Sequence, residues 1–192
     1  NGLSLENGIW RDSQRLLTRH LSLVQRLQGI AEIVARQFEV GSCAIYLVEG
    51  NRDELVMQAS IGLEASVKVR LSLGQGITGI AALEKKPIQV AHMSRDPRAV
   101  VVKNREQVYQ SIVAIPLDDG DQVHGVFNLQ STIERHFSTG EMEVLIQAVK
   151  PIILSLVNTA QSDETRQRRT NELRAINEVG QAINSGLGLD ET

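Results

Sequence analysis

Strand-like patterns occupy the middle of this 192-residue chain, and helical patterns occupy both of its ends. From Leu16 to Phe38, and again from Met142 to about Val157, apolar residues recur at steps of three, four or seven, which predicts a helix over each range. The region between them holds short runs of alternating or β-branched residues separated by turn residues. Because strands and long helices do not alternate along the chain, this order argues against a parallel sheet built from strand–helix–strand units. We therefore expect an α+β fold with a central antiparallel β-sheet.

The middle region divides into six predicted strands and one short helix. The first two strands form a hairpin around Gly50, Asn51 and Asp53, and the short helix, from Ile77 to Glu84, follows the third strand. The polar segment from Met93 to Gln107 has no sustained period, which indicates a long loop. The predicted strands cover residues 42–48, 55–61, 67–73, 88–91, 111–117 and 123–129.

The predicted C-terminal helix begins at a capping box. In the segment Ser138-Thr139-Gly140-Glu141, the serine hydroxyl accepts from the Glu141 amide and the Glu141 carboxylate reaches back to the serine. Pro151 lies inside this helix and lacks a backbone N–H, so we expect a kink or local break near Lys150. The polar stretch from Gln161 to Asn171 contains no Pro or Gly, and we prefer a continuous solvated helix there to a disordered linker. An apolar stripe resumes at Leu173, Ile176, Val179 and Ile183.

The composition excludes several kinds of partner. The chain carries 20 basic and 23 acidic residues, so it has no overall attraction for phosphate backbones or anionic lipid. One Trp, two Tyr and three Phe are too few to stack nucleic-acid bases or to line a pocket for haem or bilin. The longest apolar runs fall far short of the roughly 20 residues that cross a bilayer, and the N-terminus has no signal-peptide pattern. We expect a cytoplasmic protein with no nucleic-acid or membrane partner and no cofactor.

Cysteine and histidine usage gives no sign of an enzyme. Cys43 is the single cysteine, so neither an intrachain disulfide nor dithiol chemistry is available. A nucleophilic thiol needs a base and an accessible site, and we interpret Cys43 as a buried structural thiol. The four histidines are dispersed, without carboxylates at metal-binding spacing. We therefore predict no catalytic residues and no metal site.

Five short segments, taken together, indicate a protein family more specifically than any one of them does alone. They are Ala44–Val48, Leu71–Ala81, Lys86–Ala91 followed by Asp96-Pro97-Arg98, Ser111–Leu117 with its Pro116, and Gly125-Val126. In this set, over about residues 25 to 160, the chain resembles the GAF domain family of small-molecule sensors. It looks most like the sensory domains of bacterial nitrogen-fixation activators and of the nitrogen-branch phosphoenolpyruvate-protein phosphotransferase.

The resemblance implies a layout for the chain. The terminal helices would cover one face of the sheet, and the short helix and the long loop would cover a ligand pocket on the other face. We expect an N-terminal signalling helix over residues 1–24 and a sensor domain over residues 25–160. Residues 161–192 would form a helical linker and the start of a following domain, because the stretch from Asn171 to Glu191 looks like the helix that opens another sensor domain.

The resemblance also implies a function. The chain would be a regulatory domain of a multidomain bacterial protein, with its output domain in the same full-length chain. It would sense a small molecule and transmit pocket occupancy through terminal helices that form a homodimer, with Leu17, Leu21 and Val24 in the contact. The alternative is a GAF domain without a ligand that serves only for dimerisation and spacing.

A glycine-rich turn provides the first predicted ligand-binding residues. Gly74 to Gly79 match G-x-G-x-x-G ahead of a helix, as in a dinucleotide-binding site. That site needs a buried parallel strand before the glycines, whereas the preceding segment alternates apolar with polar residues. The resemblance implies instead a tight entry into the short helix beside the pocket, where backbone amides could meet an anionic group. The residues predicted there are Gly76, Ile77 and Thr78.

Five further residues complete the predicted site. His92 ends a strand beside the long loop. The loop carries four basic and two acidic residues, which usually means a solvated charge run. By resemblance, however, it lies over the pocket, so Arg98 or Lys103 could hold an anionic metabolite, and Tyr109 and Ser111 follow it. The residue pattern of cyclic-nucleotide-binding members is absent, so we expect an unidentified small molecule instead.

Overall fold

The computed structural model describes residues 2–49, 54–63, 69–100 and 108–186. The chain divides into two compact units, residues 1–156 and 157–192. The elements are α1 (Gly2–Leu17), α2 (Leu23–Gln37), β1 (Ser42–Glu49), β2 (Glu54–Ile61), β3 (Arg70–Ser72), α3 (Gly76–Glu84), β4 (Ile88–Val90), the 3₁₀ turn η1 (Met93–Arg95), β5 (Ser111–Asp118), β6 (Val123–Ser131), α4 (Thr139–Val144), the π-helical turn η2 (Leu145–Val149) and α5 (Lys150–Gly186).

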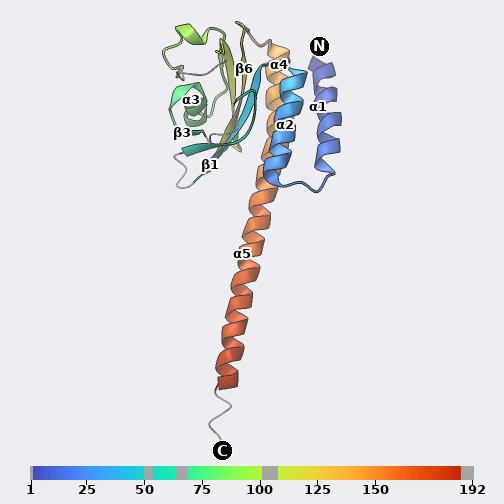
Figure 1. Ribbon diagram of the computed structural model, residues 1–192, viewed down its shortest axis with the longest axis vertical. Coiled ribbons are helices and arrows are strands. Elements are labelled where there is room, and N and C mark those ends of the chain that lie inside the picture. The colour runs from blue at the N-terminus through green and yellow to red at the C-terminus, as the bar shows by residue number, and fades with distance from the viewer. Residues whose placement is uncertain (1, 50–53, 64–68, 101–107, 187–192) are drawn as a thin grey trace, which may run out of the picture. The chain divides into compact units, whose positions relative to one another are not determined.

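Six strands of the first unit form one sheet in the order β3-β2-β1-β6-β5-β4, and every neighbouring pair is antiparallel. Helices α1, α2 and α4 lie on one side of this sheet and α3 lies on the other (Figure 1). The expected α+β fold with a central antiparallel sheet is therefore confirmed. The turn at residues 50–53, the start of the third predicted strand at residues 67–68 and part of the predicted long loop at residues 101–107 lie outside the described residues.

Alternation along the central strands builds a core on each side of the sheet. Tyr46 of β1 and Val126 of β6 are register partners, and both belong to the buried cluster on the α3 side. Ile45 and Phe127, the next pair along, are fully buried and point to the opposite face, because successive side chains of a strand alternate between faces. The sheet is thus covered on both sides, and the α3 side carries the candidate site.

The first predicted helix, from Leu16 to Phe38, is wrong as a single element. Helix α1 ends at Leu17, and α2 starts after Ser22, whose hydroxyl accepts from the Gln25 amide while the Ser22 amide donates to Gln25 Oε1. This capping box fixes a new helix start inside the apolar pattern. Residues Leu17, Leu21 and Val24 consequently do not share one helix, and α1 packs back against α2.

The C-terminal predictions agree better with the structure. The capping box between Ser138 and Glu141 is present. The predicted break near Lys150 is the π-helical turn η2, in which the Lys150 amide donates to the Leu145 carbonyl, immediately before Pro151. A wider turn accommodates a proline ring that would clash with the carbonyl four residues earlier in a regular helix. The predicted local break at this proline is therefore confirmed.

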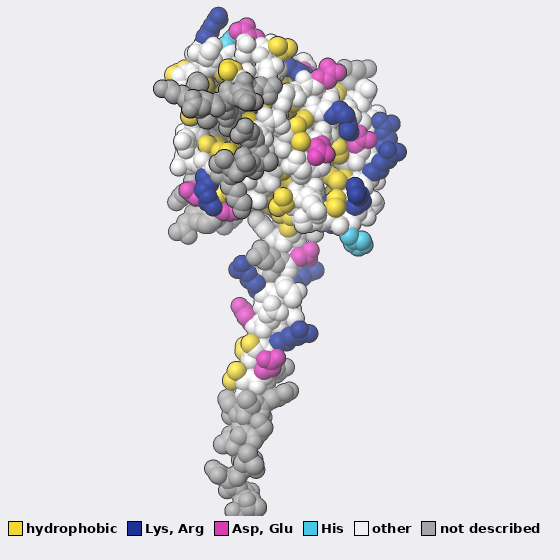
Figure 2. Space-filling view, viewed as in Figure 1, with side chains coloured by type: hydrophobic (Ala, Val, Ile, Leu, Met, Phe, Trp, Pro, Cys, Tyr) yellow, Lys and Arg dark blue, Asp and Glu magenta, His cyan; other side chains and the backbone are white. Residues whose placement is uncertain are grey.

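The second unit consists of the continuation of α5 from Val157. The predicted continuous solvated helix over residues 161–171 is confirmed, because α5 runs through them and its described side chains there are exposed or partly exposed. Figure 2 shows charged side chains of both signs along this helix, with hydrophobic ones among them. Leu173, Ile176 and Val179 are 61%, 68% and 60% exposed. In the described ranges, no helix is long and apolar enough to span a membrane.

Candidate ligand-binding site

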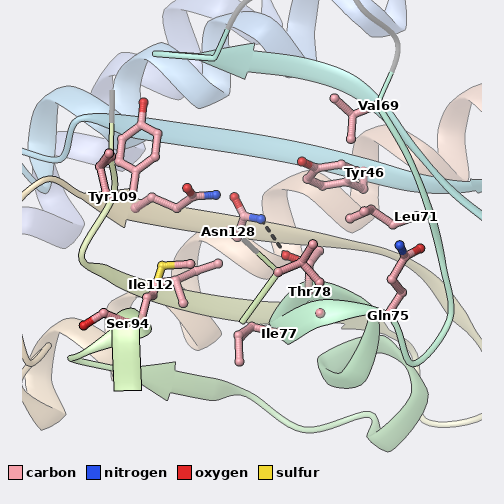
Figure 3. A pocket seen from close by; sticks show the side chains of 15 residues that line it. Tyr46, Val69, Leu71, Gln75, Ile77, Thr78, Ser94, Tyr109, Ile112 and Asn128 are labelled. Atoms are coloured by element: carbon pink, nitrogen blue, oxygen red, sulfur yellow. Dashed lines mark hydrogen bonds between the residues drawn. The ribbon is translucent and has the colours of Figure 1, made fainter. Parts of the chain in front are cut away.

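A pocket of about 300 Å³ lies on the α3 side of the sheet. It is bounded by the first turn of α3, by η1 and by strands β1, β3, β5 and β6 (Figure 3). Apolar side chains form most of its wall, among them Tyr46, Leu71, Ile77, Met93, Tyr109 and Ile112. Polar side chains interrupt this wall at Gln75, Thr78, Ser94, Asn128 and Gln130. The described part of the wall is thus apolar with a few polar groups, which is the usual make-up of a small-molecule site.

Three glycines shape the entry to α3 beside this pocket. Gly74 and Gly76 have φ values of 81° and 65°, in the left-handed region that favours glycine. Gly79 has no room for a side chain, because a Cβ built on it would lie 2.5 Å from the carbonyl oxygen of Ser72. Since the sheet is antiparallel throughout, the three glycines are explained by turn geometry and close backbone packing, not by a dinucleotide site.

Asn128 is the most unusual polar group of the pocket. It lies on the central strand β6, is 1% exposed and donates through Nδ2 to Thr78 Oγ1 over 2.8 Å (Figure 3). Its carboxamide oxygen is buried and has no hydrogen-bond partner among the described residues. A buried acceptor without a donor is costly, so this oxygen is a natural contact for a ligand.

Four predicted site residues line the pocket: Gly76, Ile77, Thr78 and Tyr109. Gly76 and Ile77 open α3, and Thr78 contributes a buried hydroxyl in the same turn. Tyr109 contributes its ring, because its hydroxyl donates to the Gly62 carbonyl over 2.5 Å and is directed away from Asn128 (Figure 3). The structure therefore brings half of the predicted set together, and their role in binding remains a prediction.

Three other predicted residues do not reach the described pocket wall. His92 Nδ1 lies 2.9 Å from Glu134 Oε1, and Ser111 Oγ donates to the Ile133 carbonyl over 3.0 Å. The Arg98 guanidinium binds both carboxylate oxygens of Asp96, and this hydrogen bonding lowers the pKa of the Asp96 carboxyl. The Arg98 guanidinium is thus paired with a carboxylate two residues earlier in the chain.

Lys103, the remaining predicted residue, lies outside the described residues. In contrast, Asn128 and Gln130 were not predicted although both line the pocket. Their two-residue spacing on β6 places them on the same face of the sheet. This spacing is the feature of the sequence from which the two residues could have been predicted as neighbours in one site.

Cys43, the single cysteine of the chain, is poorly suited to act as a nucleophile. Burial raises the pKa of the Cys43 thiol to about 12, so the reactive thiolate is scarce at neutral pH. Cys43 is also buried, as expected for a structural thiol. Within the described ranges, no group of three His, Cys, Asp or Glu side chains could hold a metal ion.

Comparison with protein families identifies the fold. The family model of the GAF domain matches residues 20–152. This match covers more than half of the chain, and the chain belongs to the GAF domain family. GAF domains are generally regulatory modules of multidomain proteins. Among curated protein sequences, none matches this chain significantly.

Solved structures show the same fold. The GAF domain of a phosphoenolpyruvate-protein phosphotransferase from Coxiella burnetii is 20% identical, with a TM-score of 0.79 over 86% of this chain and 99% of that one. The corresponding Acinetobacter domain is 23% identical, with a TM-score of 0.72 over 81% of this chain and 93% of that one. Free methionine-R-sulfoxide reductase from Neisseria meningitidis, solved with its substrate, is 18% identical, with a TM-score of 0.73 over 84% and 93%. Some proteins of this fold are thus enzymes, and identities this low support the fold alone.

Proposed function

We propose that this GAF domain is a cytoplasmic sensor module that binds a small molecule in the pocket beside α3. The pocket carries this proposal, because its volume of about 300 Å³ is at the lower end of the range of about 300–1,000 Å³ for ligand sites. Its described wall combines apolar side chains with a buried, unpartnered carboxamide oxygen. The regulatory role common to GAF domains supports the same function, and we expect no catalytic activity.

The rival function is a domain without a ligand that serves only as a dimerisation and spacing module. Such a domain would gain stability by filling the space under α3 with apolar side chains, since voids in a core are unfavourable. The open space at Asn128 and Thr78 favours the sensor function instead.

Pocket occupancy would reach the C-terminal helix through the sheet. Strand β5 carries Ile112 on the pocket wall and Asp118 at its other end. Asp118 accepts a 2.5 Å hydrogen bond from Lys150 Nζ, at the first residue of α5. A shift of β5 on ligand binding would therefore bias the start of α5, provided that the ligand prefers one of two arrangements.

Residues 161–192 would then act as a linker helix and as the start of a following domain, in a full-length protein that also holds the output domain. The exposed apolar stripe Leu173, Ile176 and Val179 lies on this helix. A second copy of the chain is the occupant that we propose for it, because an identical stripe related by a two-fold axis is self-complementary.

Native mass spectrometry of freshly purified protein tests the sensor function. We expect an additional mass of a small molecule on the wild type. A matched pair of variants localises it: Val100→Trp places a large ring at an exposed residue of the pocket wall, whereas Leu83→Trp makes the same change at an exposed residue outside it. Loss of the adduct in the first variant alone would support the pocket. No adduct, together with no thermal stabilisation by any compound of a metabolite library, would favour the spacer function.

A further inference from the structure

The ligand class follows from the polar groups of the pocket, and the inference rests on the proposed sensor function. Asn128 Nδ2 is used by Thr78, while Asn128 Oδ1 is buried without a partner in the described structure. A hydroxyl can donate as well as accept, so exchanging the amide nitrogen and oxygen would preserve the Thr78 bond and leave an N–H group unpaired instead. In both orientations, one polar end of this carboxamide needs a ligand group.

A second carboxamide lies close by on the same strand. Gln130 is 8% exposed, lines the pocket and is two residues from Asn128, so both side chains lie on the same face of β6. A carboxamide both donates and accepts, and its best complement is a group that offers an acceptor and a donor side by side. Ligand amides and lactams have this arrangement, whereas a carboxylate offers acceptors only.

The lack of charged side chains in the described pocket wall also favours a neutral ligand. None of the described residues that line the pocket has a charged side chain, and the Arg98 guanidinium is paired with Asp96. Bringing an ionised group into such a site removes its hydration, and neutral dipoles replace that hydration poorly. The first turn of α3 offers backbone amides, but in the orientation with Oδ1 unpaired the Asn128 oxygen would face an anion without a donor between them.

We propose that the pocket recognises an uncharged molecule with a carboxamide-type group on a compact apolar body. The carboxamide-type group pairs with Asn128 and Gln130, and the apolar body lies against Ile77, Ile112 and the ring of Tyr109. This neutral ligand is the alternative to the anionic metabolite expected from the sequence. Of the two cations named for that metabolite, Arg98 is already paired with Asp96, and Lys103 lies outside the described residues.

Benzamide and benzoate form a matched probe pair for this ligand class. They share a ring and nearly the same shape, but the first is neutral with a donor beside an acceptor and the second is anionic near neutral pH. Binding is measured by titration calorimetry or ligand-observed NMR on the full chain. We expect benzamide to bind at least ~10-fold more tightly than benzoate, since one hydrogen bond and one desolvated charge separate them.

Three variants connect this preference to the two carboxamides. Asn128→Leu and Gln130→Leu should each weaken benzamide binding by about 10-fold. Gln122→Leu makes the same chemical change at an exposed residue ahead of β6 and should leave binding unchanged. Thermal unfolding of each variant confirms that it is folded, and Gln130→Leu keeps the test valid if Asn128→Leu unfolds.

Two results would overturn the ligand class and leave the sensor function standing, and a third would overturn both. Equal binding of the two probes would show that the pocket does not select a neutral ligand, and tighter binding of benzoate would show that it selects anions. In either case the sensor function would stand. Binding of neither probe, alongside a co-purified molecule that has no amide-type group, would also end this inference while preserving the sensor function. If neither probe binds and native mass spectrometry shows no ligand, both proposals fail together.

Discussion

Asn128 and Thr78, fifty residues apart in the sequence, join the central strand β6 to the first turn of α3 through a buried 2.8 Å hydrogen bond. The strand lies in the middle of the sheet, and the helix bounds one side of the pocket. One polar contact therefore links the strand and the helix that form two parts of the pocket wall. Stability and ligand binding are thus expected to depend on the same pair of residues.

The Thr78→Val substitution keeps the shape of the side chain and removes the partner of Asn128 Nδ2. We expect a loss of about 1–3 kcal/mol in the free energy of unfolding, because a buried donor is left unsatisfied. The Thr78→Val/Asn128→Leu double variant should lose less than the sum of the two single changes, since both polar groups are then absent. Urea unfolding at equilibrium measures all four proteins. Additive losses would mean that the bond contributes no coupling energy.

The glycine-rich turn allows a matched test of backbone packing. Gly79→Ala should destabilise the domain by about 1–3 kcal/mol, because the new Cβ would lie 2.5 Å from the Ser72 carbonyl oxygen. Gly140→Ala makes the same change in α4, where nothing lies within 4 Å of the new Cβ. There we expect stability to be unchanged or raised by up to about 1 kcal/mol, since alanine favours helix. Thermal unfolding compares the two, and equal effects would contradict the close-packing explanation.

The fold was largely predictable because its signals are local. The alternation from Ser42 to Ile61 defines a hairpin within twenty residues, and Pro151 causes a break at its own position in the helix. The capping box at Ser22 is as local, yet apolar steps of seven and four run across it from Leu16 to Leu27. When two consecutive helices bury their apolar sides in the same core, the apolar periodicity continues from one to the other. Periodicity alone therefore cannot show where the first helix ends and the second begins.

The site was harder to predict because its parts come from distant segments. Alternation along β6 places Asn128 and Phe127 on opposite faces of the sheet. It does not say whether the face that carries Asn128 meets water or a pocket. The answer depends on α3, which is far away in the sequence and covers that face. Arg98 illustrates a contact that the residue pattern did not predict, since its guanidinium pairs with Asp96, two residues earlier.

The pH dependence of stability should include a contribution from Glu141. Burial alone would raise the pKa of its carboxyl, but hydrogen bonds from Ser138 and from the Arg135 guanidinium outweigh burial and hold the pKa below the ordinary 4.5. A lowered folded-state pKa means that the ionised group stabilises the fold above the ordinary value, and that this stabilisation is lost as the pH falls through the folded-state value. The contribution is therefore complete at neutral pH and disappears in acid.

Glu141→Gln isolates this contribution, because glutamine can still complete the capping box but carries no charge. At neutral pH we expect the variant to be less stable than the wild type by about 1 kcal/mol. The difference should shrink as the pH falls below 4.5 and through the lower folded-state pKa, because the carboxylate of the folded wild type is then protonated. Chemical unfolding over a pH series measures it, with the exposed Glu143→Gln as the control. A difference that stays constant into acid would contradict the assignment.

Self-association should depend on the apolar stripe of α5. Leu173→Glu/Ile176→Glu replaces two exposed apolar side chains with charges that repel in a symmetric pair, and we expect a dimeric wild type and a monomeric variant in sedimentation velocity at tens of micromolar. Gln167→Glu/Thr170→Glu adds the same charge to exposed polar positions of the same helix and should remain dimeric. A monomeric wild type would refute the dimer. A dimer that survives in the stripe variant would assign the contact to another surface, with the exposed Trp10 of α1 as the next residue to change.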